Sequence, residues 1–137
     1  MRGARMLLSP SDADAAKDVR VVSFNIRYGT ADDGANSRDH RRERVGAAML
    51  WWDADNNGMQ EVVAAQADWV RELLPTHTFH GVGRTDGARQ GEFAPILFRT
   101  QRFELEAAGH FWLSPTPEVV GSKGWDAALE RHRHACW

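Results

Sequence analysis

The sequence predicts a layered α+β fold, and three observations support that prediction. Residues Val19–Arg27 alternate apolar and polar side chains, which is typical of a strand with one buried face. Val45, Met49 and Trp52 recur at helical spacing, so a helix is expected to bury that stripe. Short apolar runs separated by Gly- and Pro-containing turns follow in the second half of the chain. Strands and helices are therefore mixed along one chain.

The first half of the chain is expected to form two strand–helix units. The strand over Val19–Arg27 leads through an acidic, turn-forming segment to a helix over Asp39–Trp52. A turn over Asp53–Asn57 then leads to a strand over Met59–Val63. A second helix, over Ala64–Leu74, begins directly afterwards and ends at the following proline.

The second half is expected to form strands joined by loops. We expect strands over Thr78–Val82, Ala94–Arg99 and Glu104–Leu113, with a long Gly-rich loop between the first two. The segment GWDAALERH is expected to begin a further helix. The resulting order, β-α-β-α-β-β-β, is that of an α+β layered protein.

Composition bounds the class of protein. The chain has 137 residues, enough for one domain with a core, of which 42% are hydrophobic and 26% charged. The net charge is −2, which gives no bulk attraction to nucleic acid or to an anionic membrane. Of the 17 basic residues all but Lys17 and Lys123 are arginines. Arginine binds phosphate well, but many arginines also follow from GC-rich coding, and we favour the second explanation.

Cysteine content and hydropathy favour a cytoplasmic protein. Cys136 is the only cysteine, so neither a disulfide framework nor a cysteine-based zinc site is expected. No apolar run has membrane-spanning length. Residues 1–18 are expected to form a flexible tail, too polar for the core of a signal peptide. Secretion stays open if the N-terminus is incomplete.

Three polar residues near strand ends are candidates for chemistry, and each has a plainer explanation. A carboxylate such as Glu61 within a strand costs desolvation energy, so it either faces water at a sheet edge or serves as a ligand. Asn25 either caps its strand or takes part in a site. Glu92 is either a loop carboxylate in water or a functional group.

The histidines do not form a recognisable metal pattern in the sequence. His77, His80 and His110 lie on or near expected strands, where surface or hydrogen-bonded core roles are favoured. His132 and His134 form an H-x-H pair without an evident third ligand, so we do not assign a metal to them. The GVGRTDG loop lacks the Gly-Lys-Ser/Thr ending of a phosphate-binding P-loop.

Three motifs in order resemble the endonuclease/exonuclease/phosphatase superfamily, the DNase I-like phosphoesterases. They are SFNIRYG at Ser23–Gly29, GMQEV at Gly58–Val62 and GEFAPILFR at Gly91–Arg99. The resemblance covers about residues 19–129, which would form the N-terminal portion of such a domain. It implies a β-sandwich flanked by helices, of which this chain supplies roughly the first half.

The resemblance also implies a site. Glu61 would be the metal-binding carboxylate, and Asn25 would lie beside it as a metal-side and catalytic residue that orients metal-bound water or a phosphate oxygen. Glu92 would be the catalytic carboxylate that holds a protonated histidine. The implied cofactor is Mg²⁺, with Mn²⁺ as an alternative. The implied substrate is a phosphodiester or phosphomonoester, with nucleic acid, inositol phosphate and lipid headgroups not distinguished.

The chain departs from the family pattern within the resembling region. Asn56 and Asn57 stand where an apolar pair is usual, and buried amides without partners cost on the order of 1–3 kcal/mol each. Arg38 stands where the resembling branch usually has Trp.

The family's histidine-bearing strand, Gly-Asp-x-Asn segment and Ser-Asp-His ending are not found in the 137 residues. We therefore expect a truncated, inactive chain with an uncovered sheet face that favours self-association. The alternative function is that of a non-catalytic remnant that binds a partner through this face.

The last residues carry a hypothesis about the coding sequence. Residues 130–137 follow GWDAAL with Glu-Arg-His-Arg-His, where the resembling branch usually reads Pro-Arg-Ile-Ala-Thr-Trp. Deleting one C from CGC-CAT-CGC-CAC recovers Arg-Ile-Ala-Thr. We hypothesise that residues 130–137 are an aberrant, frameshifted C-terminus.

Overall fold

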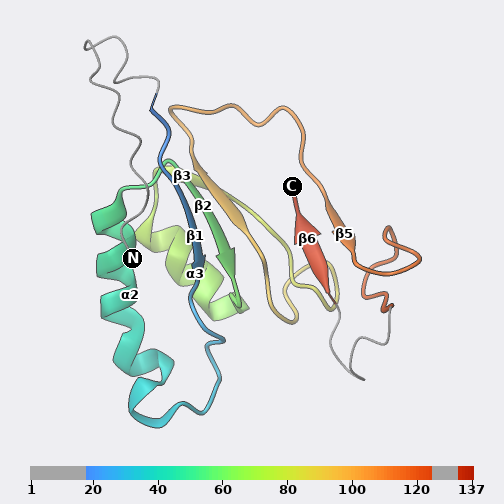
Figure 1. The fold of residues 1–137 in the computed structure, drawn as a ribbon, viewed down its shortest axis with the longest axis horizontal. Helices are drawn as coiled ribbons and strands as arrows, with labels where there is room; N and C mark the ends of the chain where they lie inside the picture. The colour runs from blue at the N-terminus through green and yellow to red at the C-terminus, as the bar shows by residue number, and fades with distance from the viewer. Residues whose placement is uncertain (1–17, 125–132) are drawn as a thin grey trace.

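The computed structural model describes residues 18–124 and 133–137, and these form the α+β fold that the sequence predicts (Figure 1). A four-stranded mixed sheet has the strand order β1-β2-β4-β3, and a separate two-stranded ribbon joins β5 to β6. The elements are β1 (Val21–Asn25), the 3₁₀-helix η1 (Gly34–Asn36), α2 (Arg38–Trp52), β2 (Asn56–Gln60), α3 (Ala64–Leu73), β3 (His77–His80), β4 (Ile96–Arg99), β5 (His110–Trp112) and β6 (His134–Cys136).

The sheet topology brings two strand ends together. β1 and β2 are parallel, paired from Val21 with Asn56 to Asn25 with Gln60, and α2 forms the crossover between them. β4 is antiparallel to both of its neighbours, β2 and β3. Because parallel strands end at the same edge of a sheet, Asn25 and the residue after Gln60 become neighbours there.

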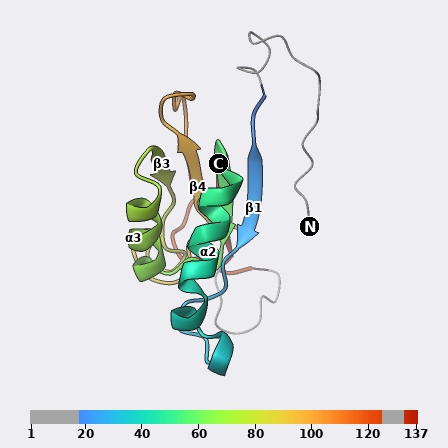
Figure 2. The same cartoon turned by 90° about the vertical axis from the view of Figure 1, so that its left-hand side faces the viewer.

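The core lies between the sheet and the two helices, which cover the same face (Figure 2). Met49 of α2 and Val70 of α3 pack against Met59 of β2 and Leu97 of β4. Val62, two residues after the end of β2, is fully buried in the same cluster. The apolar stripe expected for the first helix therefore faces the sheet, and Arg41 of α2 donates a hydrogen bond to the carbonyl oxygen of the core residue Ile26 at 3.0 Å.

The two helices agree with their predicted bounds to within one residue, but the second strand does not. The predicted turn over Asp53–Asn57 and strand over Met59–Val63 are wrong by three residues, since β2 runs from Asn56 to Gln60. The Asn pair is in the strand because its backbone pairs with β1 on one side and β4 on the other. The strand ends because Glu61 adopts φ +60°.

The later strands are shorter than predicted. β3 and β4 fall within or beside their expected ranges, but only His110–Trp112 of the predicted Glu104–Leu113 strand is extended and paired. Within the described part of the chain, residues 104–109 belong to no strand, although Gly109 exchanges two backbone hydrogen bonds with Trp137, and β5 pairs with β6. β6 was not expected, because it lies in the segment that we considered aberrant. Residues 1–17 of the predicted tail (residues 1–18) and the predicted helix after Gly124 lie outside the described residues.

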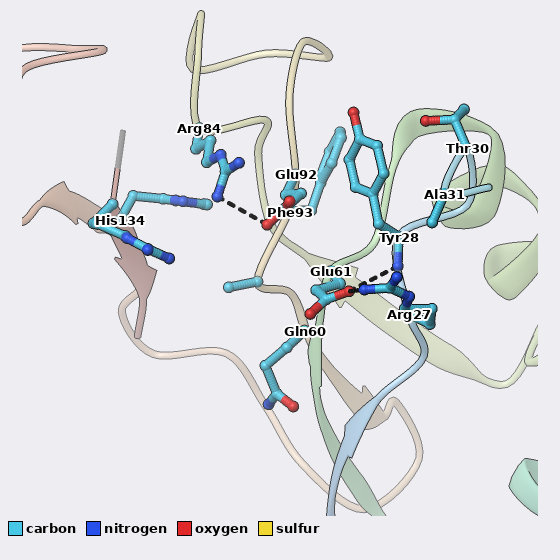
Figure 3. A pocket seen from close by; sticks show the side chains of 12 residues that line it. Arg27, Tyr28, Thr30, Ala31, Gln60, Glu61, Arg84, Glu92, Phe93 and His134 are labelled. Atoms are coloured by element: carbon cyan, nitrogen blue, oxygen red, sulfur yellow. Dashed lines mark hydrogen bonds and ion pairs between the residues drawn. The ribbon is translucent and has the colours of Figure 1, made fainter. Parts of the chain in front are cut away.

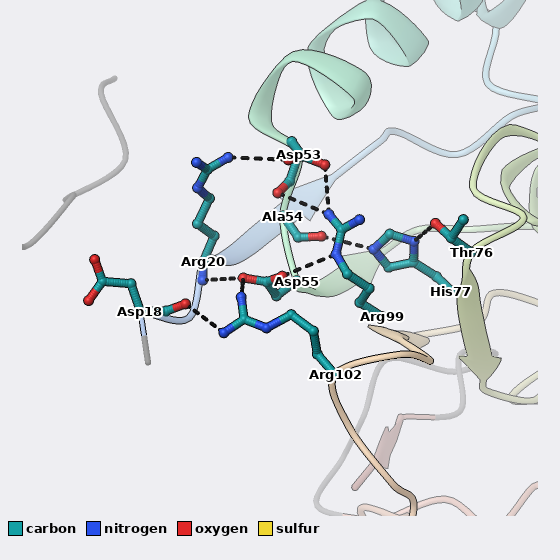
Figure 4. Close-up of polar contacts among 9 residues, drawn as sticks. All are labelled: Asp18, Arg20, Asp53, Ala54, Asp55, Thr76, His77, Arg99 and Arg102. Atoms are coloured by element: carbon teal, nitrogen blue, oxygen red, sulfur yellow. Dashed lines mark hydrogen bonds and ion pairs between the residues drawn. The ribbon is translucent and has the colours of Figure 1, made fainter. Parts of the chain in front are cut away.

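An ionic network closes the end of the sheet opposite to the carboxyl ends of β1 and β2 (Figure 4). Asp55 is buried, and its carboxylate accepts hydrogen bonds from the Arg20 backbone N–H at 2.9 Å, from Arg99 Nε at 3.1 Å and from an Arg102 terminal nitrogen at 2.7 Å. Arg99 also binds Asp53 at 2.6 Å. The network joins segments that precede β1, precede β2 and follow β4.

The face of the sheet away from the helices is only partly open. At the β3 side, His80 lies against the β5–β6 ribbon, with its Nε2 3.2 Å from the Gly109 carbonyl oxygen and its ring stacked on His110. At the β1 side, Val21 is 69% exposed. The expected uncovered face thus exists at the β1 edge and not across the whole sheet. None of the helices in the described part of the chain combines the length and hydropathy needed to cross a membrane.

Candidate functional site

A cavity of about 560 Å³ opens where β1 and β2 end (Figure 3). Its lining is strongly polar and includes three arginines and two carboxylates. The residues that line it are Arg27, Tyr28, Thr30, Ala31, Gln60, Glu61, Arg84, Glu92, Phe93, Ala94, Arg133 and His134. All three motif segments named in the sequence contribute to this lining, so the fold gathers them into one site.

Glu61 is held in the cavity as an ionised carboxylate. One oxygen accepts a hydrogen bond from the Asn25 side-chain amide at 2.9 Å, and the other accepts one from the Tyr28 backbone N–H at 2.8 Å. The Asn25 amide, followed by the Tyr28 N–H, lowers the pKa of Glu61 below its usual value. The side chain remains 30% exposed, so its outer lone pairs are available to a ligand.

Asn25 is oriented by two neighbours that fix which way its amide points. Its Oδ1 accepts a hydrogen bond from the Arg27 backbone N–H at 2.8 Å, and its Nδ2 donates to Glu61. A backbone N–H can only donate and a carboxylate can only accept, so the two partners leave a single amide orientation. Asn25 therefore positions Glu61 in this structure, and a role as a metal ligand stays a prediction.

Arg27 is the nearest cation to Glu61. One of its terminal nitrogens, NH1, lies 3.9 Å from a Glu61 oxygen. Its Nε and its other terminal nitrogen bind both oxygens of Asp33, at 2.8 and 2.7 Å. The Arg27 hydrogen bond lowers the pKa of Asp33, so both partners are charged at neutral pH.

Gln66 ties the two strand ends to helix α3. Its side-chain oxygen accepts a hydrogen bond from the Val63 N–H at 3.0 Å, and its Nε2 donates to the Arg27 carbonyl at 2.9 Å. Gly29 approaches this side chain so closely that an added Cβ would lie 2.8 Å from Gln66 atoms. The loop after β1 is therefore packed directly on the start of α3.

Glu92 lies in the cavity but binds an arginine. Arg84 forms a 2.8 Å ion pair with the Glu92 carboxylate, and both side chains are less than one-fifth exposed. The alternative prediction, that Glu92 is a loop carboxylate surrounded by water, is therefore wrong. The predicted histidine partner is not seen among the described residues, and a catalytic role for Glu92 stays a prediction.

His134 is the histidine that lines the cavity, and it is bound elsewhere. Its Nε2 lies 3.1 Å from the Val82 carbonyl oxygen, and its ring stacks on Trp112. Burial, which outweighs the hydrogen bond to Val82, lowers its pKa, so it is neutral at pH 7. Trp112 in turn donates from Nε1 to the Arg84 carbonyl oxygen at 2.6 Å.

The sequence identified the carboxylates of the site but missed its arginines. Arg27 stands two positions after Asn25 within SFNIRYG, which was a usable signal, but its left-handed φ of +67° could not be read from the sequence. Arg84 lies in the Gly-rich loop that carried no recognised motif. Asp33 was missed because it lies among other acidic and turn-forming residues, from which the sequence does not distinguish it.

The donor set suits a hard divalent cation. Glu61 offers free carboxylate lone pairs toward the cavity, whereas the Gln60 side chain turns away from it and donates from Nε2 to Ser23 Oγ at 3.2 Å (Figure 3). In the described residues no group of three His, Cys, Asp or Glu side chains gathers to form a complete protein cage. Mg²⁺ needs no such cage, because it keeps several waters and is held by one or two carboxylates plus substrate oxygens. The residues present therefore fit such an ion.

Comparisons with known proteins agree on one family of structures. The chain is similar to an endonuclease/exonuclease/phosphatase from Bacteroides vulgatus, with 39% identity and a TM-score of 0.81 over 87% of this chain and 45% of that one. It is similar to an endonuclease/exonuclease/phosphatase family protein from Bacteroides thetaiotaomicron, with 37% identity and a TM-score of 0.79 over 87% of this chain and 42% of that one.

A third solved structure carries a named activity. It is a mannosyl-6-phosphatase from Bacteroides thetaiotaomicron, with 37% identity and a TM-score of 0.79 over 88% of this chain and 45% of that one. The chain thus spans somewhat less than half the length of the structures it matches. No protein-family profile matches it, and no curated protein does either.

Proposed function

The chain belongs to the endonuclease/exonuclease/phosphatase family, and from this premise we propose that its cavity is the metal side of a phosphoesterase active site. The observation that carries the proposal is the Asn25–Glu61 hydrogen bond at the adjoining ends of two parallel strands. An ionised carboxylate held this way, beside several arginines in one cavity, has the chemistry that phosphate ester hydrolysis requires.

Each residue has a separate task in the proposed mechanism. Mg²⁺, or Mn²⁺ in its place, would supply charge neutralisation for the phosphate and activation of the attacking water. Glu61 would hold the ion, and Asn25 and the Tyr28 N–H keep the carboxylate ionised and aimed at the cavity. The cavity arginines would bind the phosphate oxygens.

We favour a phosphomonoester as the substrate. The cavity presents three arginines, Arg27, Arg84 and Arg133, against the carboxylates Glu61 and Glu92. A divalent cation at Glu61 makes this lining strongly positive, which suits a dianionic monoester better than a monoanionic diester. The similar mannosyl-6-phosphatase acts on a phosphomonoester, which points the same way. Nucleic acid, inositol phosphate and lipid headgroups with a terminal phosphate all meet this requirement.

We propose further that this chain alone hydrolyses phosphate esters slowly or not at all. Glu92 pairs with Arg84 and His134 binds Val82, so neither is arranged as a general acid or base toward Glu61. Proton transfer to the leaving oxygen then has no assigned group among the described residues.

Calorimetric titration of Mg²⁺ into the purified chain tests the metal site. We expect saturable binding in the wild type, loss of binding in Glu61→Gln, and unchanged binding in Glu118→Gln, which alters an exposed carboxylate outside the cavity. Equal binding by the wild type and Glu61→Gln would refute the site. Concentration-dependent association, with no Mg²⁺-linked rise in melting temperature, would instead support the non-catalytic partner-binding alternative.

A further inference from the structure

We propose that Arg27 is a phosphate-binding residue that couples the binding of phosphate to that of the divalent cation, and that Asp33 is the residue that positions it. The inference rests on the proposed function, because it concerns the same cavity. It assigns a role to an ion pair that the sequence reasoning did not identify.

The hydrogen bonds of the guanidinium divide it into a fixed side and an open side. Asp33 occupies Nε and one terminal nitrogen in a bidentate pair. The other terminal nitrogen, NH1, carries two N–H groups and lies 3.9 Å from a Glu61 oxygen, at the wall of the cavity. Since a planar guanidinium cannot turn without breaking both Asp33 bonds, NH1 stays aimed at the place where an anion next to Glu61 would lie.

The surroundings keep the backbone of Arg27 in an unusual conformation. Arg27 has φ +67°, a left-handed value that is uncommon outside glycine. Its N–H is bound by Asn25 and its carbonyl oxygen accepts from Gln66. An exposed surface arginine needs no such support, so the arrangement indicates that the direction of this side chain matters.

Electrostatics then predict a coupling between two ligands. The charge of Arg27 partly neutralises Glu61 and opposes a cation there when the cavity holds no anion. A phosphate bound to NH1 neutralises the charge of Arg27 and so removes its repulsion of a cation at Glu61. A cation at Glu61 in turn strengthens the binding of the phosphate. By linkage, each ligand must raise the affinity for the other by the same factor.

The experiment measures Mg²⁺ affinity by calorimetry with and without saturating inorganic phosphate. In the wild type we expect phosphate to raise Mg²⁺ affinity by about tenfold, within the range usual for coupled sites. In Arg27→Gln we expect Mg²⁺ affinity without phosphate to rise severalfold and the effect of phosphate to fall to about twofold or less. A purely structural role of Arg27 would lower both affinities together.

Two further variants separate charge from position, and a third serves as control. Arg27→Lys keeps the charge but not the bidentate geometry, so it should still oppose Mg²⁺ alone and lose most of the coupling. Asp33→Asn should reduce the coupling while Arg27 remains. Arg89→Gln removes another arginine held in a bidentate pair, with Asp68, outside the cavity, and should change neither affinity.

The outcomes distinguish this inference from the proposed function. If the wild type binds no Mg²⁺, both are overturned. If Mg²⁺ binds through Glu61 but phosphate leaves its affinity unchanged, or Arg27→Gln keeps the full coupling, only the inference is overturned. Unchanged coupling in Asp33→Asn would overturn the positioning role of Asp33.

Dimethyl phosphate, a monoanion, should give a weaker coupling than inorganic phosphate at pH 7.5 if the dianion is what the site selects.

Discussion

At the scale of single residues, the site depends on two non-glycine residues in the left-handed region, Arg27 and Glu61. Such conformations cost on the order of 1–3 kcal/mol each and persist only where neighbours enforce them. Here Glu61 directly follows β2 and Arg27 lies two residues after the end of β1, and the turns they make bring Glu61 and the Tyr28 N–H to face one another. The strain is thus located where it arranges the candidate ligands.

Gln66 is the residue on which this arrangement most depends. It is 3% exposed and hydrogen-bonds both to Val63, after Glu61, and to Arg27. We expect Gln66→Ala to lower the free energy of unfolding by about 2 kcal/mol, because two backbone groups lose their partner. Urea denaturation measures this loss, and Mg²⁺ affinity should fall with it. Gln90→Ala, at an exposed loop position, is the control; a similar loss there would argue against the role of Gln66.

At the scale of elements, strand β2 shows how pairing can override composition. A segment beginning Asn-Asn-Gly has poor strand propensity, yet it is a central strand because β1 and β4 pair with it on both sides. Asn57 faces the helices and is 3% exposed. A side-chain amide with so little exposure stands where an apolar residue is usual, so we expect the departure from an apolar pair to have a cost.

That cost can be measured by replacing the amide. Asn57→Leu should raise the free energy of unfolding by about 1 kcal/mol, because a buried polar group is exchanged for an apolar one of similar size. Asn56→Leu is the matched control, since Asn56 is a half-buried neighbour on the opposite face, and should give no comparable gain. Thermal unfolding of the two variants measures this difference in stability. Destabilisation by Asn57→Leu would show that the amide is hydrogen-bonded or that leucine does not fit.

At the scale of the whole molecule, Asp55 joins parts of the chain that are far apart in sequence. Its carboxylate binds residues 20, 99 and 102 at the edge of the sheet opposite to the cavity (Figure 4). Asp55→Asn should lower the free energy of unfolding by on the order of 2 kcal/mol, since two guanidinium groups lose a buried charge partner. Asp53→Asn changes a 63% exposed carboxylate and should cost far less. Equal effects in urea denaturation would contradict the central position of Asp55.

The same carboxylate predicts how stability depends on pH. Burial alone would raise the pKa of Asp55, but the Arg20 N–H and the Arg102 guanidinium outweigh it and lower the pKa below its usual value. A lowered folded-state pKa means that the stabilisation is complete above the unfolded-state pKa, about 4, and is lost as pH falls through the folded-state value. The difference in stability between wild type and Asp55→Asn should therefore be constant above about pH 5 and shrink below pH 4. A difference that did not change down to pH 3 would contradict this assignment.

The sequence by itself determined the elements whose signal is local. The helices over residues 38–52 and 64–73 follow from side chains repeating at helical spacing, and the α+β class follows from their order with the strands. The resemblance of its motifs also indicated that Asn25 and Glu61 lie near the ends of two strands, and the parallel pairing of those strands brings them together.

Only the tertiary structure decided the register of β2, the short extent of β5 and the partners of the charged residues. A strand exists where a neighbour supplies hydrogen bonds, so Asn56 and Asn57 belong to a strand while residues 104–108 do not. The ion pairs of Arg27 with Asp33 and of Arg84 with Glu92 likewise depend on backbone turns and on distances between atoms. Local periodicity reports the conformation that a segment prefers, whereas hydrogen bonds and charge pairs depend on which segments the fold brings together.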